Sequence, residues 1–349
     1  MLALAGYPLG LRCVFLDRSN DAPGAKVAPI LVGDIEDPAL LSELASNSDV
    51  ITFDWENISA KALEPLEKIT AIRPSATALE ASQDRLKEKA LLARLKIPVA
   101  AHAAVDSHED LLKAVNRLGL PGVLKTVRLG YDGKGQQILR HPEQVADAWR
   151  DLGGQALIYE RFQAFSREVS LVGARSLSGQ EVYYPLCANR HERGILRYSV
   201  APYANPALQR TAQTYLRRVM NALEYVGVLT LEFFVVKGKL IANEMAPRVH
   251  NSGHWTIEGC VTSQFENHLR AICDLPLGST RPLGHAAMIN FLGNMPDRYR
   301  LLAIDGLAFH DYGKAARPGR KLGHCTILKS SKKDLNRALA NALKLIHWN

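Results

Sequence analysis

Residues 229–248 read LTLEFFVVKGKLIANEMAPR, and this stretch predicts two antiparallel strands joined by a short Lys-Gly-Lys turn. The first strand carries Glu232, and the second carries Asn243 and Glu244. Side chains alternate between the two faces of a strand, so the turn decides whether the two carboxylates meet. A two-residue turn would place them on opposite faces. A three-residue turn, or a bulge at Gly238, would place them on one face.

The polar residues of this hairpin are candidate metal ligands. Two carboxylates and an amide are hard oxygen ligands, which suit Mg²⁺ held between a protein and nucleotide phosphates. The alternative is a pair of solvent-facing acids, which the otherwise apolar strands disfavour. Burying both acids unpaired would be costly, and a metal ion removes that cost. The hairpin therefore predicts a Mg²⁺ site with Glu232 and Glu244 as ligands.

A second segment, residues 123–138, reads VLKTVRLGYDGKGQQI. A predicted strand delivers Lys125, and Gly130, Gly133 and Gly135 follow before a returning strand. Glycines let the backbone approach a ligand closely and direct its N–H groups at phosphate oxygens. The glycine order matches neither the Walker A motif nor the dinucleotide fingerprint. A flexible hairpin with ordinary turn glycines is the alternative interpretation.

Two further polar segments follow in the chain. Residues 248–254 concentrate hydrogen-bond donors next to the predicted metal site, as binding of a small oxyanion requires. Residues 313–324 read GKAARPGRKLGH, and arginine binds a phosphate dianion bidentately. A plain polar loop and a solvated basic turn are the respective alternatives. The basic side chains of the second segment are Lys314, Arg317, Arg320 and Lys321.

The organisation of the chain predicts more than one packed unit, since 349 residues exceed a single small core. Residues 1–88 alternate short strands with helices, which favours a parallel sheet. Residues 89–275 predict an α+β domain, and residues 276–349 predict a small β-rich domain. The expected strands are 11–16, 49–53, 123–125, 137–139, 156–159, 168–173, 182–186, 228–236, 287–292, 307–311 and 323–328. The expected helices are 38–45, 57–68, 83–95, 108–118, 142–152, 206–223, 261–273 and 333–346.

Composition excludes several functional classes. The net charge of +8 comes from scattered Lys and Arg, which fits pockets for phosphorylated ligands better than a nucleic-acid groove. We therefore expect no nucleic-acid partner. No apolar run approaches the roughly 18 residues that cross a bilayer, and the N-terminus lacks the features of a signal peptide. Five dispersed cysteines, never paired as CxxC, favour a reducing cytoplasm over a disulfide framework.

In this order, the segments resemble the 5-(carboxyamino)imidazole ribonucleotide synthase family of purine biosynthesis. The resemblance spans about residues 51–324, and its most specific stretches are GYDGKGQ, SREVSLVGAR, NEMAPRVHNSGHWT, SQFENHLRA and RPGRKLGH. It implies an ATP-grasp fold with an N-terminal Rossmann-like (pre-ATP-grasp) domain. Family members begin with a strand and a Gly-Gln-Leu-Gly loop, whereas residues 1–6 match the helix that follows. We therefore expect that domain to lack its first strand.

The resemblance also implies roles for individual residues. The nucleotide would lie between two subdomains, with Glu160 opening a hinge beside the adenine and Glu168 holding the ribose. Lys125, Arg248, His250 and Asn251 are the implied catalytic residues. The implied ATP-binding residues are Arg85, Lys125, Gly130, Tyr131, Asp132, Gly133, Lys134, Gly135, Gln136, Glu160, Arg161, Phe162, Gln163, Glu168, His191, Asn243 and Glu244. The implied ribonucleotide-binding residues are Glu56, Tyr131, Asp132, Lys314, Arg317, Arg320 and Lys321.

The implied reaction is a carboxylation with ATP, bicarbonate and 5-aminoimidazole ribonucleotide as substrates and Mg²⁺ as cofactor. Carboxyphosphate would be the intermediate, and ADP and phosphate the by-products. The expected enzyme is a cytoplasmic homodimer. One alternative is another ATP-grasp ligase that activates formate or an amino acid as an acyl phosphate. The other is a non-catalytic nucleotide-binding homologue.

Overall fold

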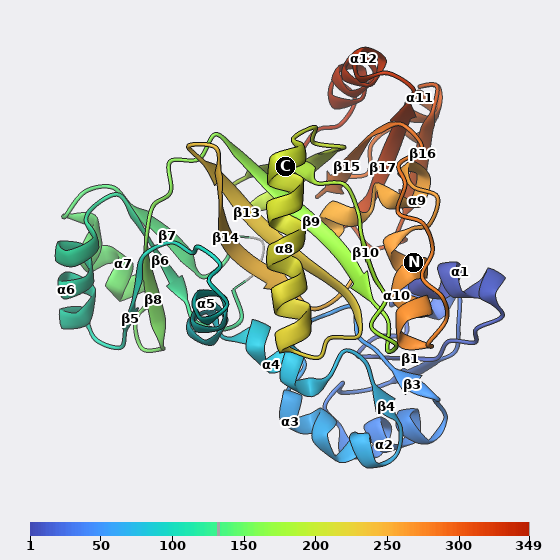
Figure 1. Cartoon of the computed structure of the whole chain (residues 1–349), viewed down its shortest axis with the longest axis horizontal. Coiled ribbons are helices and arrows are strands. Elements are labelled where there is room, and N and C mark those ends of the chain that lie inside the picture. The colour runs from blue at the N-terminus through green and yellow to red at the C-terminus, as the bar shows by residue number, and fades with distance from the viewer. Residues whose placement is uncertain (131–132, 349) are drawn as a thin grey trace.

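A computed structural model describes residues 1–130 and 133–348 (Figure 1). In the N-terminal part the strands pair in parallel, as predicted, but they form two separate two-stranded pairs, β1–β2 and β3–β4. Each of these strands is only two or three residues long. The elements are α1 (Leu2–Gly6), β1 (Phe15–Asp17), β2 (Ile30–Val32), α2 (Pro38–Ser46), β3 (Val50–Ile51), α3 (Ala60–Leu63), β4 (Ala71–Ile72) and α4 (Ala76–Gln83).

Some predicted elements of this part are too long. The strand expected from residue 11 begins only at Phe15, which is the first residue to pair with β2. The helix expected over residues 57–68 divides into α3 and a 3₁₀ turn, Glu64–Lys68. Pro65 explains the division, because proline has no N–H to donate within an α-helix. Asp84 accepts hydrogen bonds from two backbone N–H groups and starts α5 (Arg85–Arg94) as a separate helix.

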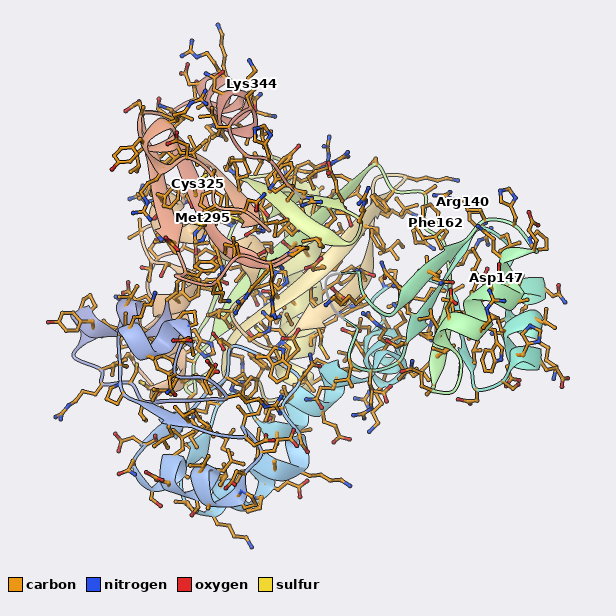
Figure 2. All side chains as sticks on the ribbon, turned by 180° about the vertical axis from the view of Figure 1, so that it is seen from behind. Arg140, Asp147, Phe162, Met295, Cys325 and Lys344 are labelled. Carbon is orange, nitrogen blue, oxygen red and sulfur yellow. The ribbon has the colours of Figure 1, made fainter. Side chains whose placement is uncertain are left out.

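A four-stranded antiparallel sheet follows α5, in the order β5-β8-β6-β7. Helices α6 and α7 cover it, and together they enclose a core that includes Leu111, Leu124 and Tyr159. Figure 2 shows Asp147 on this lobe, well away from Cys325 and Lys344. Strand β5 was not predicted. The elements are β5 (His102–Val105), α6 (His108–Leu118), β6 (Gly122–Thr126), β7 (Gln136–Leu139), α7 (Gln144–Leu152) and β8 (Leu157–Arg161).

The remaining strands form one nine-stranded sheet in the order β14-β13-β9-β11-β12-β15-β17-β16, with β10 paired to β9. Because β12 pairs with β15, the sheet runs across residue 276, where we expected a domain boundary. Its strands are β9 (Arg167–Arg175), β10 (Glu181–Tyr183), β11 (Cys187–Glu192), β12 (Ile195–Ala201), β13 (Gly227–Val236), β14 (Lys239–Ala246), β15 (His285–Leu292), β16 (Leu307–Asp311) and β17 (Lys321–Lys329).

Helices cover this sheet and bury its apolar side chains. Helix α8 packs across β9 and β13 (Figure 1), and its Leu216 belongs to the same buried core as Leu171 and Leu229. Strand β10 ends before Pro185, which cannot donate to a strand ladder. Strands β11 and β12 were not predicted, and polar residues interrupt the apolar pattern of β11. The helices are α8 (Pro206–Ala222), α9 (Thr256–Gly259), α10 (Gln264–Ile272), α11 (Arg298–Leu302) and α12 (Lys332–Leu343).

The β13–β14 hairpin differs from the sequence prediction in one respect. Its turn has two residues, since Val236 pairs with Lys239. The register then shifts between Glu232 and Phe233, and Glu232 lies directly opposite Glu244. Both routes that we expected, a three-residue turn and a bulge at Gly238, are therefore wrong: the extra residue is Asn243. The expected outcome is nevertheless confirmed, because cross-strand partners project from the same face of a sheet.

Candidate functional site

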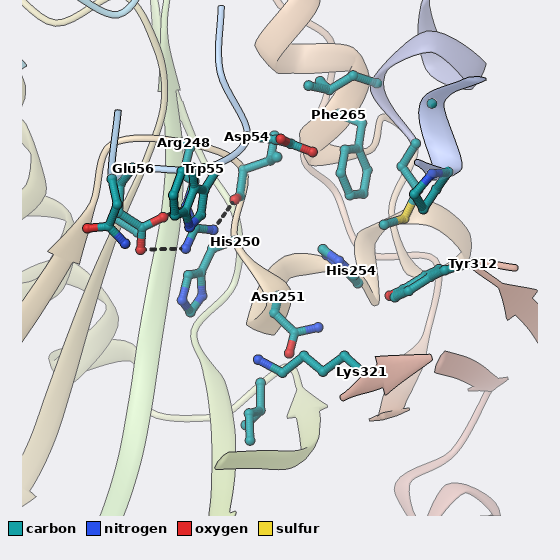
Figure 3. A pocket seen from close by; sticks show the side chains of 18 of the residues that line it. Asp54, Trp55, Glu56, Arg248, His250, Asn251, His254, Phe265, Tyr312 and Lys321 are labelled. Atoms are coloured by element: carbon teal, nitrogen blue, oxygen red, sulfur yellow. Dashed lines mark hydrogen bonds and ion pairs between the residues drawn. The ribbon is translucent and has the colours of Figure 1, made fainter. Parts of the chain in front are cut away.

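The candidate site is a cleft of about 1050 Å³ where the N-terminal part, the hairpin and the start of β17 meet. Figure 3 shows Arg248, His250, Asn251 and Lys321 facing this space. The structure thus gathers side chains from segments far apart in the sequence. The predicted residues that line the cleft are Glu56, Arg85, Gly130, His191, Glu232, Glu244, Arg248, His250, Asn251, Lys314 and Lys321.

The two acids of the hairpin are each held by a hydrogen-bond donor from another element. Glu232 Oε1 lies 3.0 Å from His250 Nε2, and Glu244 Oε2 lies 3.1 Å from Arg85 Nη1. Burial alone would raise the pKa of Glu232, but the hydrogen bond from His250 and the nearby positive charges lower it to about 2. Glu232 is therefore a carboxylate across the physiological range.

These residues fit a magnesium ion. Within residues 1–130 and 133–348, no cluster of three or more His, Cys, Asp or Glu side chains is arranged to hold a metal. The two facing carboxylates nevertheless form the small protein ligand set that Mg²⁺ uses alongside phosphates. Asn243, the residue before Glu244, does not line the cleft, but its Oδ1 is buried and has no hydrogen-bond partner within the described residues, so it is a free acceptor.

A second charged cluster lies behind the acids. Glu160 on β8 lies between two lysines, with Oε2 3.2 Å from Lys125 Nζ and Oε1 3.3 Å from Lys89 Nζ. Burial would raise the pKa of Glu160, but the lysines lower it to about 2. Burial also lowers the pKa of Lys125, against the attraction of Glu160. Lys89 also donates to the backbone oxygen of Asn243, 3.3 Å away, and so links this cluster to the bulge.

Sequence reasoning missed Lys89 and its neighbour Glu88. Both lie on α5 and are buried, and the Glu88 carboxylate accepts a hydrogen bond from the backbone N–H of Met245. Burial raises the pKa of Glu88 to about 8, and the charge of Glu244 acts in the same direction. The signal that could have found them is their place on the inner face of a helix, where unpaired charges are rare.

Arg248 and Glu56 form a bidentate ion pair at the edge of the cleft (Figure 3). Nη2 donates to Oε1 over 2.8 Å, and Nε donates to Oε2. Burial would raise the pKa of Glu56, but the hydrogen bond and charge of Arg248 hold it below its usual value. Asn251 exchanges two amide hydrogen bonds with Asn290, of 2.7 and 3.0 Å, which fix its orientation. The loop after β14 therefore presents preorganised groups.

His191 and Glu168 form another pair, on β11 and β9. His191 Nδ1 lies 3.1 Å from Glu168 Oε2. Burial would lower the pKa of His191, but the hydrogen bond to Glu168 and the charge of Glu232 raise it. Only His191 lines the cleft. The structure thus places the predicted ribose-binding acid next to the predicted nucleotide-site histidine.

The glycine-rich loop is described except for Tyr131 and Asp132, which lie outside the described residues. Gly133 has a φ of +78°, and a Cβ there would lie 2.5 Å from the backbone oxygen of Arg193. The loop therefore packs closely against the β11–β12 turn, as only glycine permits. Apart from Gly130 at the cleft, the predicted residues of this loop, namely Gly133, Lys134, Gly135 and Gln136, lie outside its lining.

The predicted hinge residues 161–163 also lie outside the cleft lining. The backbone N–H of Phe162 donates to Pro121 over 3.1 Å, and Gln163 Nε2 donates to the backbone oxygen of Arg161. The guanidinium of Arg140 lies 6.0 Å from the centre of the Phe162 ring, and Figure 2 labels this pair. These contacts hold the segment at the C-terminal end of β8.

The four basic side chains of residues 313–324 lie in different places. Lys314 and Lys321 line the cleft, and burial lowers the pKa of Lys314 with help from the charges of Arg320 and Lys321. Arg317 instead lines a separate depression of about 170 Å³ beside Gly293. Arg320 Nη1 donates to the backbone oxygen of Ala315 over 3.2 Å. The structure therefore brings two of the four predicted basic residues into the cleft.

In the described parts of the chain, no helix is long and apolar enough to cross a membrane.

Comparisons with known proteins extend these observations. Three family models match, namely the ribonucleotide synthetase preATP-grasp domain over residues 1–83, the ATP-grasp domain over residues 90–265 and the phosphoribosylaminoimidazole carboxylase C-terminal domain over residues 286–338. The N5-carboxyaminoimidazole ribonucleotide synthase of Pseudomonas aeruginosa is 46% identical, over 99% of this chain and 96% of the relative. That of Vibrio cholerae is 44% identical, over 97% and 90%.

Solved structures agree with these relatives. The N5-carboxyaminoimidazole ribonucleotide synthetase of Thermus thermophilus superposes with a TM-score of 0.96 at 48% identity, covering 100% of this chain and 96% of that one. The Aspergillus clavatus synthase, solved with ADP and 5-aminoimidazole ribonucleotide, gives a TM-score of 0.91 at 28% identity, covering 99% and 94%. The ATP-grasp fold with its preceding and following domains is thus confirmed.

Proposed function

The chain belongs to the N5-carboxyaminoimidazole ribonucleotide synthase family, and from this premise we propose that it carboxylates 5-aminoimidazole ribonucleotide with ATP and bicarbonate. The products are N5-carboxyaminoimidazole ribonucleotide, ADP and phosphate. The observation that carries the proposal is the convergence in one cleft of the acidic hairpin, the Arg248–Asn251 loop and two lysines. The cleft is thus suited to a nucleotide phosphate, a small oxyanion and a second phosphate.

The first step is phosphoryl transfer. A bicarbonate oxygen attacks the γ-phosphorus of ATP, and the bond from that phosphorus to the oxygen of ADP breaks. Positioning and electrostatics dominate such reactions. Lys125 would face the phosphates, and the Lys89–Glu160 pair would remain behind it. Glu168 and His191 would contact the ribose side of the nucleotide. Arg248 and Asn251 would hold the bicarbonate, and His250 would orient the Glu232 carboxylate beside it.

Glu232 and Glu244, with Asn243 beside them, would hold magnesium, which when bound supplies positive charge against the phosphate oxygens. The Arg85–Glu244 pair shows that this edge of the cleft already accommodates a cation. Arg85 would then turn to the nucleotide.

The second step joins the carboxyl carbon to the substrate amine. The exocyclic nitrogen attacks that carbon, the bond from the carbon to the phosphate oxygen breaks, and the amine loses a proton. Carboxyphosphate hydrolyses readily, so the site must exclude water. The close packing of Gly133 on the β11–β12 turn supports such closure. Glu56, Lys314 and Lys321 would contact the ribonucleotide. From the family resemblance, the proposal also includes that the protein is a cytoplasmic homodimer.

The test is a coupled assay of ADP release. We expect release that requires both bicarbonate and 5-aminoimidazole ribonucleotide, with a product carrying one additional carboxylate by mass spectrometry. Release that depends on formate and not on bicarbonate would contradict the proposal in favour of an acyl-phosphate ligase. Tight ATP binding without ribonucleotide-dependent release would contradict it in favour of a non-catalytic homologue.

A further inference from the structure

We propose that a directed chain of hydrogen bonds, running from Ser199 to Glu232, fixes the ring tautomer of His250. Ser252 and Ser170 are then positioning residues for the carboxylation. The role in catalysis rests on the function proposed above, whereas the chain itself rests on contacts between this protein's own residues.

The direction of the chain begins with the two ring nitrogens of His250. Nε2 lies 3.0 Å from the carboxylate oxygen Oε1 of Glu232, which can only accept. Nδ1 accepts from the backbone N–H of Ser252, 3.3 Å away. The first contact requires a hydrogen on Nε2, and the second requires Nδ1 to be without one. The ring is therefore a donor to Glu232.

The hydroxyl of Ser252 continues the chain. Its Oγ lies 2.8 Å from His250 Nδ1 and 2.7 Å from Ser170 Oγ. Because Nδ1 has no hydrogen, the single hydroxyl hydrogen of Ser252 must point to Nδ1. The hydrogen between the two serines must then come from Ser170. Neither serine has an alternative that keeps both contacts.

Two strands supply the remaining links. Asn189 Nδ2 donates to Ser170 Oγ over 3.0 Å, and Ser199 Oγ donates to Asn189 Oδ1 over 2.8 Å. The sheet register produces this alignment, since Asn189 pairs with Ser199 and Glu232 pairs with Ser170. The chain thus crosses β12, β11, β9 and β13, which are four consecutive strands of the sheet.

Burial makes this chain more than a set of incidental contacts. Ser170, Ser199 and Ser252 are fully buried, and Asn189 is nearly so. Hydrogen bonds donated in one direction polarise one another where water is excluded. Cys187 Sγ lies 3.1 Å from Ser170 Oγ, and burial raises the pKa of this thiol to about 11, so it adds no charge to the chain. The buried polar atoms therefore stay satisfied only in this arrangement.

The consequence concerns the cleft, which both His250 and Glu232 line. The chain holds the ring with its Nε2–H toward the Glu232 carboxylate and its Nδ1 toward the buried serines. His250 is thus presented as a fixed donor, and the Glu232 carboxylate is oriented by it. Loss of the Ser252 hydroxyl would leave Nδ1 with one weak backbone donor and release the ring to rotate or change tautomer.

The experiment uses the full chain labelled with ¹⁵N-histidine. Long-range ¹H–¹⁵N spectra report which ring nitrogen carries the hydrogen, and His250→Gln assigns the signals by their loss. In the wild type we expect a protonated Nε2 and an unprotonated Nδ1. In Ser252→Ala we expect the ¹⁵N shifts of Nδ1 and Nε2 to approach each other or to exchange values, because the ring then mixes or reverses its tautomers. A wild-type ring protonated on Nδ1 alone would overturn the proposal, as would identical spectra for Ser252→Ala.

Kinetic measurements distinguish a positioning role of Ser252 and Ser170 from a role in stability alone. We expect kcat to fall about tenfold in Ser252→Ala and about threefold in Ser170→Ala, with the KM for ATP nearly unchanged. Ser170→Thr retains the hydroxyl and should restore the spectrum and the rate. The control is Thr326→Val, which removes a fully buried hydroxyl that has no partner among the described residues. A fall in kcat of the same size in Thr326→Val would contradict a positioning role for Ser252 and Ser170. An inactive wild type with the expected spectra would contradict the proposed function and still support the chain.

Discussion

One charged region lines the cleft and a second lies behind it, and the two are built differently. The hairpin cluster consists of Glu232, Glu244, Arg248 and His250. In it, Glu232 pairs with His250, and Glu244 and Arg248 each form one ion pair with a residue outside the cluster. The lysine cluster consists of Lys89, Lys125 and Glu160, in which two cations share one anion. Side chains in the hairpin pairs remain 12–42% exposed, whereas those in the lysine cluster are 0–9% exposed.

This difference indicates a division of labour. A pair in the hairpin cluster can be exchanged for a ligand, because water or a phosphate can reach both partners. A member of the lysine cluster cannot be lost without leaving a buried charge uncompensated. We therefore expect hairpin substitutions to affect turnover more than folding, and lysine-cluster substitutions to affect folding strongly.

The largest expected effect is on turnover in Glu244→Gln. Removing one carboxylate from the proposed magnesium pair should lower kcat at least about a hundredfold. The side chain is 42% exposed, so the thermal unfolding midpoint should stay near the wild-type value. The coupled ADP-release assay and a melting curve measure the two quantities. The matched control is Glu43→Gln, an exposed acid on α2, and near-normal turnover in Glu244→Gln would refute the metal assignment.

Lys89→Met is expected to lower the stability of the fold. Truncating a fully buried cation leaves Glu160 with only Lys125, which should lower the free energy of unfolding by about 3–5 kcal/mol. Lys87→Met removes the next exposed lysine of the same helix, whose pair with Glu80 should contribute less than about 1 kcal/mol. Urea unfolding of both variants measures the two losses in the free energy of unfolding. Equal losses would show that burial does not distinguish the two lysines.

Glu88 provides a pH test of the same region. Its pKa is about 8 against an ordinary value of 4.5, so the folded protein retains a proton that the unfolded chain releases. The contribution of Glu88 to the free energy of unfolding is therefore complete below about pH 4.5. It is lost as the pH rises toward 8, with a slope of at most about 1.4 kcal/mol per pH unit. Glu88→Gln should flatten that slope in urea unfolding between pH 5 and 8. A slope unchanged from wild type would contradict the raised pKa.

The smallest effect is expected at the hairpin turn. Gly238 has a φ of +75°, and a Cβ there would meet nothing within 4 Å. Gly238→Ala should therefore cost about 1 kcal/mol of stability through backbone strain alone, with kcat unchanged. Chemical unfolding and the ADP-release assay measure both. A large loss of turnover would mean that the turn, and not the bulge at Asn243, aligns the two acids.

Much of the site could be predicted because its residues are local in sequence. The hairpin, the loop after it and the glycine-rich segment each lie within about twenty residues, and their residue types indicate their chemistry. The bulge could not be placed, because Asn243 looks like an ordinary strand residue until its partner strand is known. The basic segment shows a related limit: four cations stand close in sequence, but only Lys314 and Lys321 line the cleft.

The sequence by itself determined the family, most of the strands and helices and the residue types of the site, since these depend on residue type and short-range periodicity. Only the tertiary structure decided which charges are paired and buried. Lys89 reaches Glu160 across 71 positions of the chain, and Arg248 reaches Glu56 across 192. Such partners depend on how sheets and helices pack, and the free energy of a buried charge depends on its partner more than on its neighbours in sequence.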